Sequence, residues 1–347
     1  MKRILFAASV VALSAALAGP ALARDQIHIA GSSTVLPYAQ IVAEEFGKTF
    51  SNFKTPVVES GGSGAGIKQF CQSVDENSID IANSSRPIKK EEIASCNQAG
   101  VKDVIEVKIG YDGIVFASDI NGPTFAFEPK DWYLAIADQI PVDGKMTANP
   151  NKSWKDVNSN FPDQPIATFI PGEKHGTREV FEQKVLVAGC KALKADEALI
   201  QSGVDKKDVD KACAKVRKDG VAVDIDGDYT ETLARLQSNK QGIGVFGLAF
   251  YENNTDKLKV ATVSGIGPSV ETIAAGKYPV SRPLFFYVKK AHIGAVPGLQ
   301  EYSEFFVSDK IAGADGPLAE YGLVPMPEAE LKQVQDMVKA QTVMATQ

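Results

Sequence analysis

The sequence predicts an α/β protein whose two domains face each other across a cleft. Short β-branched segments alternate with helical segments between residues 27 and 96, which is typical of βαβ units and a mainly parallel sheet. Two further apolar strands, at residues 104–117 and 283–288, can each cross from one domain to the other. With 347 residues, the chain is also longer than one hydrophobic core usually organises.

The elements follow in a regular order along the chain. Strands are expected at residues 27–30, 55–59 and 79–82, and helices follow them at residues 37–50, 66–71 and 89–96. The middle block should hold helices at 132–138, after 177 and at 230–238, with strands at 165–170 and 243–248. An amphipathic helical tail follows the second crossing strand. We therefore expect one domain from residues 24–112 together with 281–347, and another from residues 113–280.

The first 23 residues have the features of a secretory signal peptide. Lys2 and Arg3 precede an apolar run, and small residues close it at Ala23. About fifteen apolar residues are too few for an ordinary membrane span, and the leader has no Cys, so we expect cleavage near Ala23 and a periplasmic protein. Cleavage moves the formal net charge from −6 to about −8. Nucleic acid is therefore not expected as a partner, because such binding depends on neutralising phosphates with Lys and Arg.

Four cysteines fall into two pairs, Cys71 with Cys96 and Cys190 with Cys213, with about 25 residues in each. An even number of cysteines in an exported chain favours two disulfides. Three pairings are possible, and we favour the two local ones. A zinc site is disfavoured, because no pair has the CxxC spacing and the chain has only 3 histidines. We expect no metal and no cofactor.

Four turns rich in Ser, Thr and Gly each precede a helical segment. They are GSST at 31–34, SGGSGAG at 60–66, SSRP at 84–87 and HGT at 175–177. The first N–H groups of a helix have no intrahelical partner and carry partial positive charge, so such turns can hold an oxyanion. In a parallel sheet the turns that follow the strands gather at one edge. The candidate ligands of the anion are Ser33, Thr34, Ser63, Ser85, Arg86, His175, Gly176, Thr177 and Arg178.

Seven segments, which span nearly the whole chain, resemble the periplasmic phosphate-binding proteins, the solute receptors of phosphate ABC importers. They are AGSSTVLPYAQ from Ala30, GGSGAGIKQF from Gly61, DIANSSRPIK from Asp80, GYDGIVFAS from Gly110, HGTREVF from His175, GIGVFGLAFY from Gly242 and YPVSRPLFFYVKK from Tyr278. The resemblance implies a type II, Venus-flytrap fold with a cleft between two doubly wound domains. It also implies a monomer that closes on one inorganic phosphate and delivers it to membrane permease subunits.

Three positions depart from the family pattern. Ser85 and Arg86 stand where many relatives have an Asp that accepts a hydrogen bond from a protonated phosphate, although another branch also carries Ser-Arg. His175 replaces a Ser of the second-domain turn. An Arg that often precedes this turn is absent, so Arg86 or Arg178 is expected to supply the cation.

Two other functions compete with a phosphate receptor. One is a receptor of the same fold that binds sulfate, molybdate or tungstate. Ser85 favours this alternative, because a fully ionised oxyanion offers no proton and needs no Asp to accept one. A secreted phosphohydrolase is the other alternative, but we find no nucleophile, base or set of metal ligands for it, and we do not expect an enzyme. The segment 224–228 resembles a calcium loop, yet its Gly falls at the fourth position, so we expect a cap for the helix at Thr230 instead.

Overall fold

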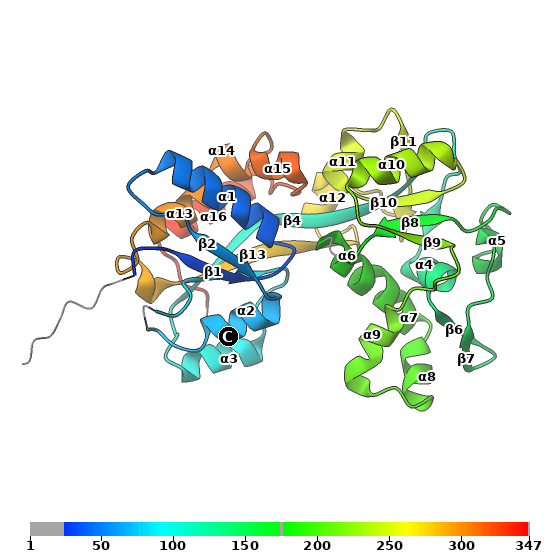
Figure 1. Ribbon diagram of the computed structural model, residues 1–347, viewed down its shortest axis with the longest axis horizontal. Coiled ribbons are helices and arrows are strands. Elements are labelled where there is room, and N and C mark those ends of the chain that lie inside the picture. The colour runs from blue at the N-terminus through cyan, green and yellow to red at the C-terminus, as the bar shows by residue number, and fades with distance from the viewer. Residues whose placement is uncertain (1–23, 76, 174–175, 346–347) are drawn as a thin grey trace, which may run out of the picture.

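Two long strands join two lobes that lie side by side (Figure 1). The computed structural model describes residues 24–75, 77–173 and 176–345, so the expected leader lies outside the described residues. The joining strands are β4 (Val104–Asp119) and β13 (Ser281–Lys289), which pair antiparallel with each other. The first part of β4 and most of β13 belong to the sheet of the first lobe, whereas residues 114–119 of β4 pair with strands of the second lobe. The placement of the domain boundaries at 112/113 and 280/281 stays a prediction.

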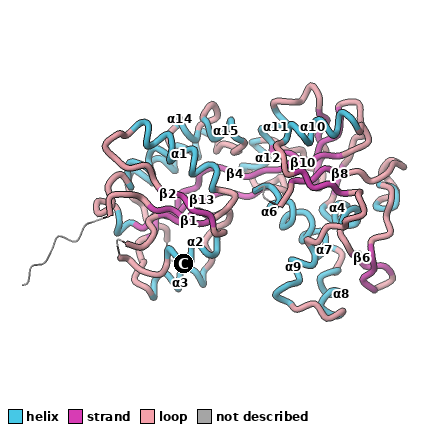
Figure 2. Tube along the Cα trace, in the orientation of Figure 1, coloured by secondary structure: helices cyan, strands magenta, loops and turns pink. Residues whose placement is uncertain are grey.

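Three parallel strands form the base of the first lobe. They lie in the order β2 (Val57–Ser60), β1 (His28–Gly31) and β3 (Ile81–Ser84). Helices α1 (Leu36–Thr49), α2 (Ser63–Phe70) and α3 (Lys90–Gln98) follow these strands in the chain and cover both faces of the sheet (Figure 2). Gly31 pairs with Ser60 on one side and with Asn83 on the other, so the strands end at the same level. The turns that follow them leave the sheet at one edge, as the alternating pattern predicts.

The second lobe repeats this arrangement. Its parallel strands lie in the order β10 (Ile243–Gly247), β8 (Thr168–Pro171) and β9 (Ala222–Ile225), and β11 (Leu258–Val260) pairs with the end of β4. Helix α6 (Gly176–Phe181) follows β8, and α10 (Tyr229–Ser238) follows β9. The side chain of Asp228 accepts a hydrogen bond from the backbone N–H of Thr230 at 2.9 Å, which confirms the predicted helix cap.

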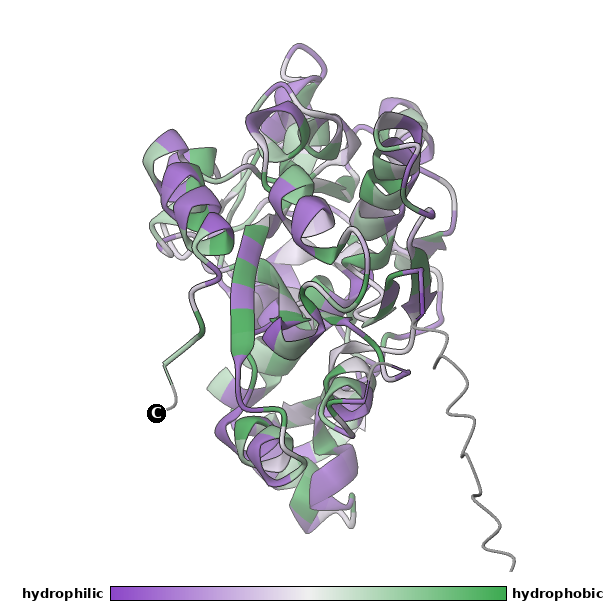
Figure 3. Ribbon diagram, turned by 90° about the vertical axis from the view of Figure 1, so that its left-hand side faces the viewer, coloured by the Kyte–Doolittle hydropathy of each residue, from purple (hydrophilic) through white to green (hydrophobic). Residues whose placement is uncertain are grey.

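The chain after β13 packs onto the first lobe. The helices of this part are α13 (Leu299–Phe306), α14 (Asp309–Ala312), α15 (Pro317–Tyr321) and α16 (Glu328–Lys339). In the lobe that faces the viewer in Figure 3, hydrophilic and hydrophobic residues alternate along the helices. The ring of Phe46 on α1 lies 5.5 Å from Tyr302 and 6.0 Å from Phe305, between ring centroids. Tyr111 of β4 exchanges two backbone hydrogen bonds of 2.9 Å with Val324. The predicted amphipathic tail is therefore confirmed, and it completes the first lobe.

The pairing of the sheet differs from the mainly parallel arrangement that the sequence predicts. Strand β13 runs antiparallel to both β3 and β4, and β4 runs antiparallel to β10, so the centre of the sheet is mixed. Local apolar patterns identify strands but not their direction, and β13 enters the first lobe from the opposite end to β1 and β3. The hairpin of β6 (Gln139–Val142) and β7 (Lys145–Ala148) was also missed, although Asp143-Gly144, both with positive φ, is a typical hairpin turn.

The remaining elements are short and belong mostly to the second lobe. Among the residues that the structure describes, no helix is long and apolar enough to cross a membrane. The elements are β5 (Ala126–Phe127), α4 (Pro129–Ile136), α5 (Trp154–Val157), a π-helix (Glu182–Val187), α7 (Ala188–Ala192), α8 (Ala195–Gln201), a 3₁₀ turn (Lys206–Asp208), α9 (Val209–Cys213), α11 (Leu248–Glu252), β12 (Thr262–Val263), α12 (Val270–Ala274) and a 3₁₀ turn (Lys290–His292).

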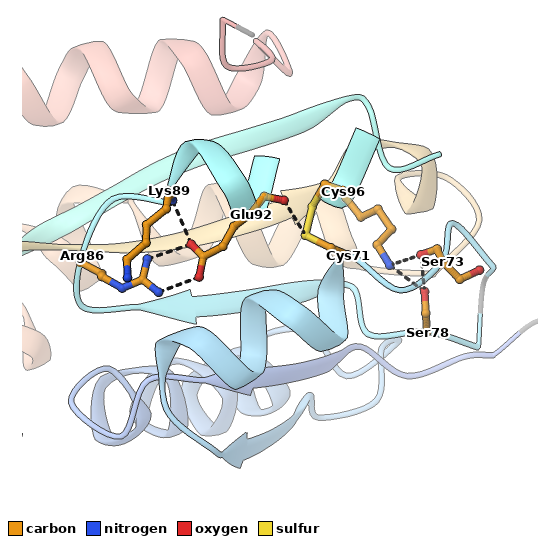
Figure 4. The surroundings of a disulfide bond; sticks show 8 residues. Cys71, Ser73, Ser78, Arg86, Lys89, Glu92 and Cys96 are labelled. Carbon is orange, nitrogen blue, oxygen red and sulfur yellow. Dashed lines mark hydrogen bonds and ion pairs between the residues drawn. A yellow bond between two sulfur atoms is a disulfide. The ribbon is translucent and has the colours of Figure 1, made fainter. Parts of the chain in front are cut away.

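Two local disulfides link neighbouring helices, as predicted. Cys71, at the end of α2, is bonded to Cys96 in α3, with a Cα–Cα distance of 4.2 Å (Figure 4). Cys190 in α7 is bonded to Cys213 in α9, with a Cα–Cα distance of 5.7 Å. Each disulfide closes a loop of moderate length, 25 and 23 residues, and so restricts the unfolded chain.

We predict that removing the second disulfide lowers stability without moving the cleft. Replacing both partners, Cys190→Ala with Cys213→Ala, should lower the free energy of unfolding by about 3 kcal/mol, because the loop it closes in the unfolded chain is released. Urea denaturation followed by circular dichroism measures this. An unchanged free energy of unfolding, or a peptide map of the oxidised protein that joins Cys71 to Cys190, would contradict the assignment.

Candidate functional site

Three turns of the first lobe meet at the carboxyl edge of its strands, and two glycines let them pack closely. Gly31 has a φ of +144°, and a Cβ on it would lie 2.2 Å from the carbonyl oxygen of Asn83. A Cβ on Gly66 would lie 2.4 Å from the Cα of Gly31. The N–H groups of Gly61 and Gly62 both donate to the carbonyl oxygen of Gly31, at 2.9 and 2.8 Å. Backbone contact therefore requires glycine at residues 31 and 66.

Ser63 and Ser85, from the second and third turns, lie against each other. Their hydroxyl oxygens are 3.1 Å apart, and the backbone N–H of Ser85 donates to the hydroxyl of Ser63 at 3.1 Å. Ser85 is buried, and Ser63 is the first residue of α2, where the helix has unpaired N–H groups and partial positive charge. The structure thus brings these two predicted ligands together as a pair of hydroxyl donors.

Thr34 is the residue of the first turn that reaches the second lobe. It is buried, whereas Ser33 beside it is exposed. The hydroxyl of Thr34 donates to Oε2 of Glu179 at 3.2 Å and accepts from Nη2 of Arg282 at 3.0 Å. This contact connects the turn before α1, helix α6 and the joining strand β13 at one point between the lobes.

Arg86 lies beside the second turn and is held by α3. Its two terminal nitrogens donate to the carboxylate of Glu92 at 2.9 and 2.7 Å (Figure 4), and this hydrogen bonding raises the pKa of the guanidinium. The side chain of Arg86 is 30% exposed, and a Cβ on Gly64 would lie 3.7 Å from its Nη2. Glu92 therefore positions a partly exposed cation next to Ser63 and Ser85.

The second lobe contributes Thr177 to a cavity that Thr34 also lines. A cavity of about 300 Å³ lies between the lobes, and its wall contains both Thr34 and Thr177 as well as Tyr38, Asp112 and Tyr229. Gly176, another predicted ligand, begins α6. The prediction for His175 lies outside the described residues. Residues of both lobes, Thr34 and Thr177 among them, thus line one cavity.

Arg178, the other predicted cation, is engaged within the second lobe. Its Nε donates to Glu182 at 2.7 Å, and its Nη1 donates to the carbonyl oxygen of Pro171 at 2.8 Å and also to Asp224. These partners tie α6 to the ends of β8 and β9. The buried guanidinium therefore fixes the position of α6, and through it that of Thr177.

Sequence reasoning missed three charged residues at the centre of the molecule. Arg282 and Asp112 are direct partners in the antiparallel register of β13 and β4, and both are buried. Glu179 lies on α6 and forms an ion pair with Arg282 at 3.1 Å. The sequence contains a signal that could have identified Arg282. An arginine at the start of an apolar strand, as in RPLFFYV, indicates a buried cation with a function.

Asp112 has an unusual environment for a carboxylate. Its Oδ2 lies 3.6 Å from Nε of Arg282, and these two atoms have no hydrogen-bond partner among the described residues. Burial raises the pKa of Asp112 to about 6, although the charge of Arg282 opposes this, and Glu179 adds to the increase. The carboxyl group consequently changes its charge close to neutral pH.

We predict that Asp112 makes stability depend on pH between about 4 and 7. The pKa is higher in the folded than in the unfolded chain, so the group stabilises the fold at low pH, and this contribution is lost as the pH rises through about 6. The free energy of unfolding of the wild type should fall relative to that of Asp112→Asn by about 2 kcal/mol over this range. Urea denaturation at several pH values measures the difference, and a difference independent of pH would contradict the raised pKa.

Comparison with known proteins shows which family this chain resembles. The model of the PBP superfamily domain matches residues 17–310. The phosphate-binding protein PstS of Staphylococcus haemolyticus is 32% identical over 318 residues, which cover 89% of this chain and 84% of that protein. Protein SphX of Synechococcus elongatus is 30% identical, over 88% of this chain and 78% of its own.

Solved structures agree with this match. A crystal structure described as a possible phosphate binding protein from Planctomyces limnophilus has a TM-score of 0.69 and 26% identity, covering 91% of this chain and 98% of that one. PstS from Borrelia burgdorferi, at 20% identity and a TM-score of 0.59, shares the fold. The chain therefore belongs to the PBP superfamily, in the family that contains the PstS phosphate-binding proteins.

Proposed function

We propose that this protein is a periplasmic receptor that captures inorganic phosphate between its lobes and delivers it to the permease subunits of an ABC importer. The observation that carries the proposal is that Thr34 of the first lobe and Thr177 of the second line one cavity between the lobes. The relatives named phosphate-binding protein PstS support phosphate as the ligand. Export by cleavage near Ala23 and a monomeric receptor are parts of the same proposal.

The proposed site relies on hydrogen-bond donors more than on net charge. Ser63, Ser85 and Thr34 of the first lobe, together with Thr177, would donate hydroxyl groups to phosphate oxygens. An anion can bind in this way to a protein with a formal net charge of −6, because local dipoles act at short range. Water is excluded when the lobes close, which strengthens each of these hydrogen bonds. The other proposed ligands are Ser33, Arg86, His175 and Gly176.

We assign Arg178 a positioning role in this proposal. Its donors are engaged with Glu182, Asp224 and Pro171, so contact with an anion would require breaking a buried ion pair. The hinge is proposed at residues 112/113 and 280/281, where β4 and β13 pass between the lobes. One domain then comprises residues 24–112 with 281–347, and the other residues 113–280.

The family consists of binding proteins, and the site has the character of a receptor. Catalysis of phosphate-ester hydrolysis would need a nucleophile with a base, or a metal centre. Among the described residues, Ser63 and Ser85 hydrogen-bond to each other, and neither has a histidine as a partner. Among the described residues, no group of three or more His, Cys, Asp or Glu side chains could hold a metal ion.

We predict that the purified chain, stripped of ligand, binds one phosphate and closes over it. Isothermal titration calorimetry should give one site per chain, and small-angle scattering should give a smaller radius of gyration with phosphate. Sulfate should bind more weakly under the same conditions. Equal or tighter binding of sulfate would assign the protein to fully ionised oxyanions, and hydrolysis of a chromogenic phosphate ester would contradict a receptor.

The two serines of the first lobe should each contribute measurably to affinity. Ser63→Ala and Ser85→Ala are each expected to raise the dissociation constant for phosphate about tenfold, because a hydrogen bond to a charged ligand is lost. Ser238→Ala is the matched control, since its hydroxyl donates to the carbonyl oxygen of Ala234 on α10 at 3.0 Å. Thermal unfolding of each variant checks that the fold is intact. Unchanged phosphate affinity in both site variants would show that the anion does not bind at these turns.

A further inference from the structure

A carboxylate of the second lobe lies against Thr34, which lines the proposed cleft. Oε2 of Glu179 accepts the hydroxyl proton of Thr34 at 3.2 Å and pairs with Nη2 of Arg282 at 3.1 Å. The charge of Glu179 also contributes to the raised pKa of Arg86, after the larger effect of Glu92. The carboxylate therefore lies among the donors of the first lobe, although it belongs to α6.

These contacts use the same donors that a bound oxyanion would need. The hydroxyl of Thr34 has one proton, and that proton is engaged by Glu179. Arg282 presents the same nitrogen to Thr34 and to Glu179, at 3.0 and 3.1 Å. A carboxylate and a tetrahedral oxyanion compete for such a pair, because both accept charge-assisted hydrogen bonds of similar geometry.

The charges around Arg282 make it unfavourable for an anion to bind beside Glu179. One guanidinium already faces two carboxyl groups, those of Asp112 and Glu179. Asp112 is buried in the strand that pairs with β13 and cannot leave, whereas the side chain of Glu179 is 41% exposed. Glu179 also has a second partner on the surface of its own helical segment, because Gln183 donates to its Oε1 at 3.3 Å. Glu179 is thus the carboxylate that can move aside.

We propose that the carboxylate of Glu179 occupies the position of the anion in the empty cleft. Arg282 is then a further ligand-binding residue, and phosphate reaches Arg282 by displacing Glu179. This inference rests on the proposed function of the cleft. In the empty cleft the carboxylate satisfies Thr34 and Arg282 across the two lobes. When phosphate arrives, it takes over both donors, and Glu179 turns toward Gln183 and solvent. The site then exchanges one anion for another and leaves no buried donor unsatisfied.

The test is a double-mutant cycle on phosphate affinity. Glu179→Gln keeps the size of the side chain but removes its charge, so phosphate should bind about tenfold more tightly once its competitor is weakened. Arg282→Lys should bind phosphate much more weakly, because the planar fork of donors is lost. In the Arg282→Lys background, Glu179→Gln should raise the affinity by clearly less than tenfold, since only its competition for Thr34 then remains.

Glu231→Gln is the matched control for the loss of charge. Glu231 also lies in the second lobe, pairs with an arginine at 3.1 Å and is 43% exposed, but its partner is Arg235 on α10, outside the cleft. Its phosphate affinity should equal that of the wild type. If Arg282→Lys does not fold, a crystal structure of the wild type with phosphate replaces the cycle. It should show Thr34 and Arg282 on the phosphate and Glu179 displaced.

Unchanged or weaker phosphate binding by Glu179→Gln would overturn the inference. Weaker binding of phosphate together with tighter binding of sulfate would mean that Glu179 receives a proton from the ligand. A phosphate complex in which Glu179 still contacts Thr34 would overturn it as well. A wild type that does not bind phosphate at all would instead overturn the proposed function, so the two failures are distinguishable.

Discussion

The ion pair between Arg282 and Asp112 is the constraint on which the rest of the structure depends. The two residues face each other on β13 and β4, at the point where these strands pass from one lobe to the other. Both are buried, and Arg282 also pairs with Glu179, so loss of the arginine would leave two carboxyl groups without their cation. From this position Arg282 contacts Thr34 of the first lobe and Glu179 of the second. Arg282 therefore links the two crossing strands to residues of both lobes.

Close backbone packing determines where the donors of the first lobe lie. The strands β2, β1 and β3 end level with one another, and Gly31 and Gly66 let their turns approach to contact distance. The hydroxyls of Ser63 and Ser85 meet at this edge, and Glu92 orients Arg86 beside them. In the second lobe, Arg178 fixes α6 through Asp224 and Pro171. Buried contacts thus fix the positions of the polar groups at these helix starts, which would otherwise act only as helix caps.

The sequence allowed the elements and the grouping of the turns to be predicted, because both follow from local patterns. Alternating strands and helices predict the carboxyl edge where Ser63 and Ser85 meet, and the spacing of the cysteines favours both disulfides. The directions of β4 and β13 could not be predicted, because strand pairing depends on distant segments. For the same reason Glu179 was not among the predicted site residues. Its role depends on Thr34 and Arg282, which are 145 and 103 positions away in the chain.

The most direct test of the account is to locate a bound oxyanion in a crystal. Arsenate has the charge and tetrahedral shape of phosphate, and its heavy central atom gives an anomalous signal that identifies its position. The account predicts one strong peak between the lobes, with arsenate oxygens within hydrogen-bond distance of the hydroxyls of Thr34 and Thr177. A peak instead in the outer groove lined by Arg178, Lys211 and Lys215 would contradict it, because the donors of the two lobes would then have no common ligand.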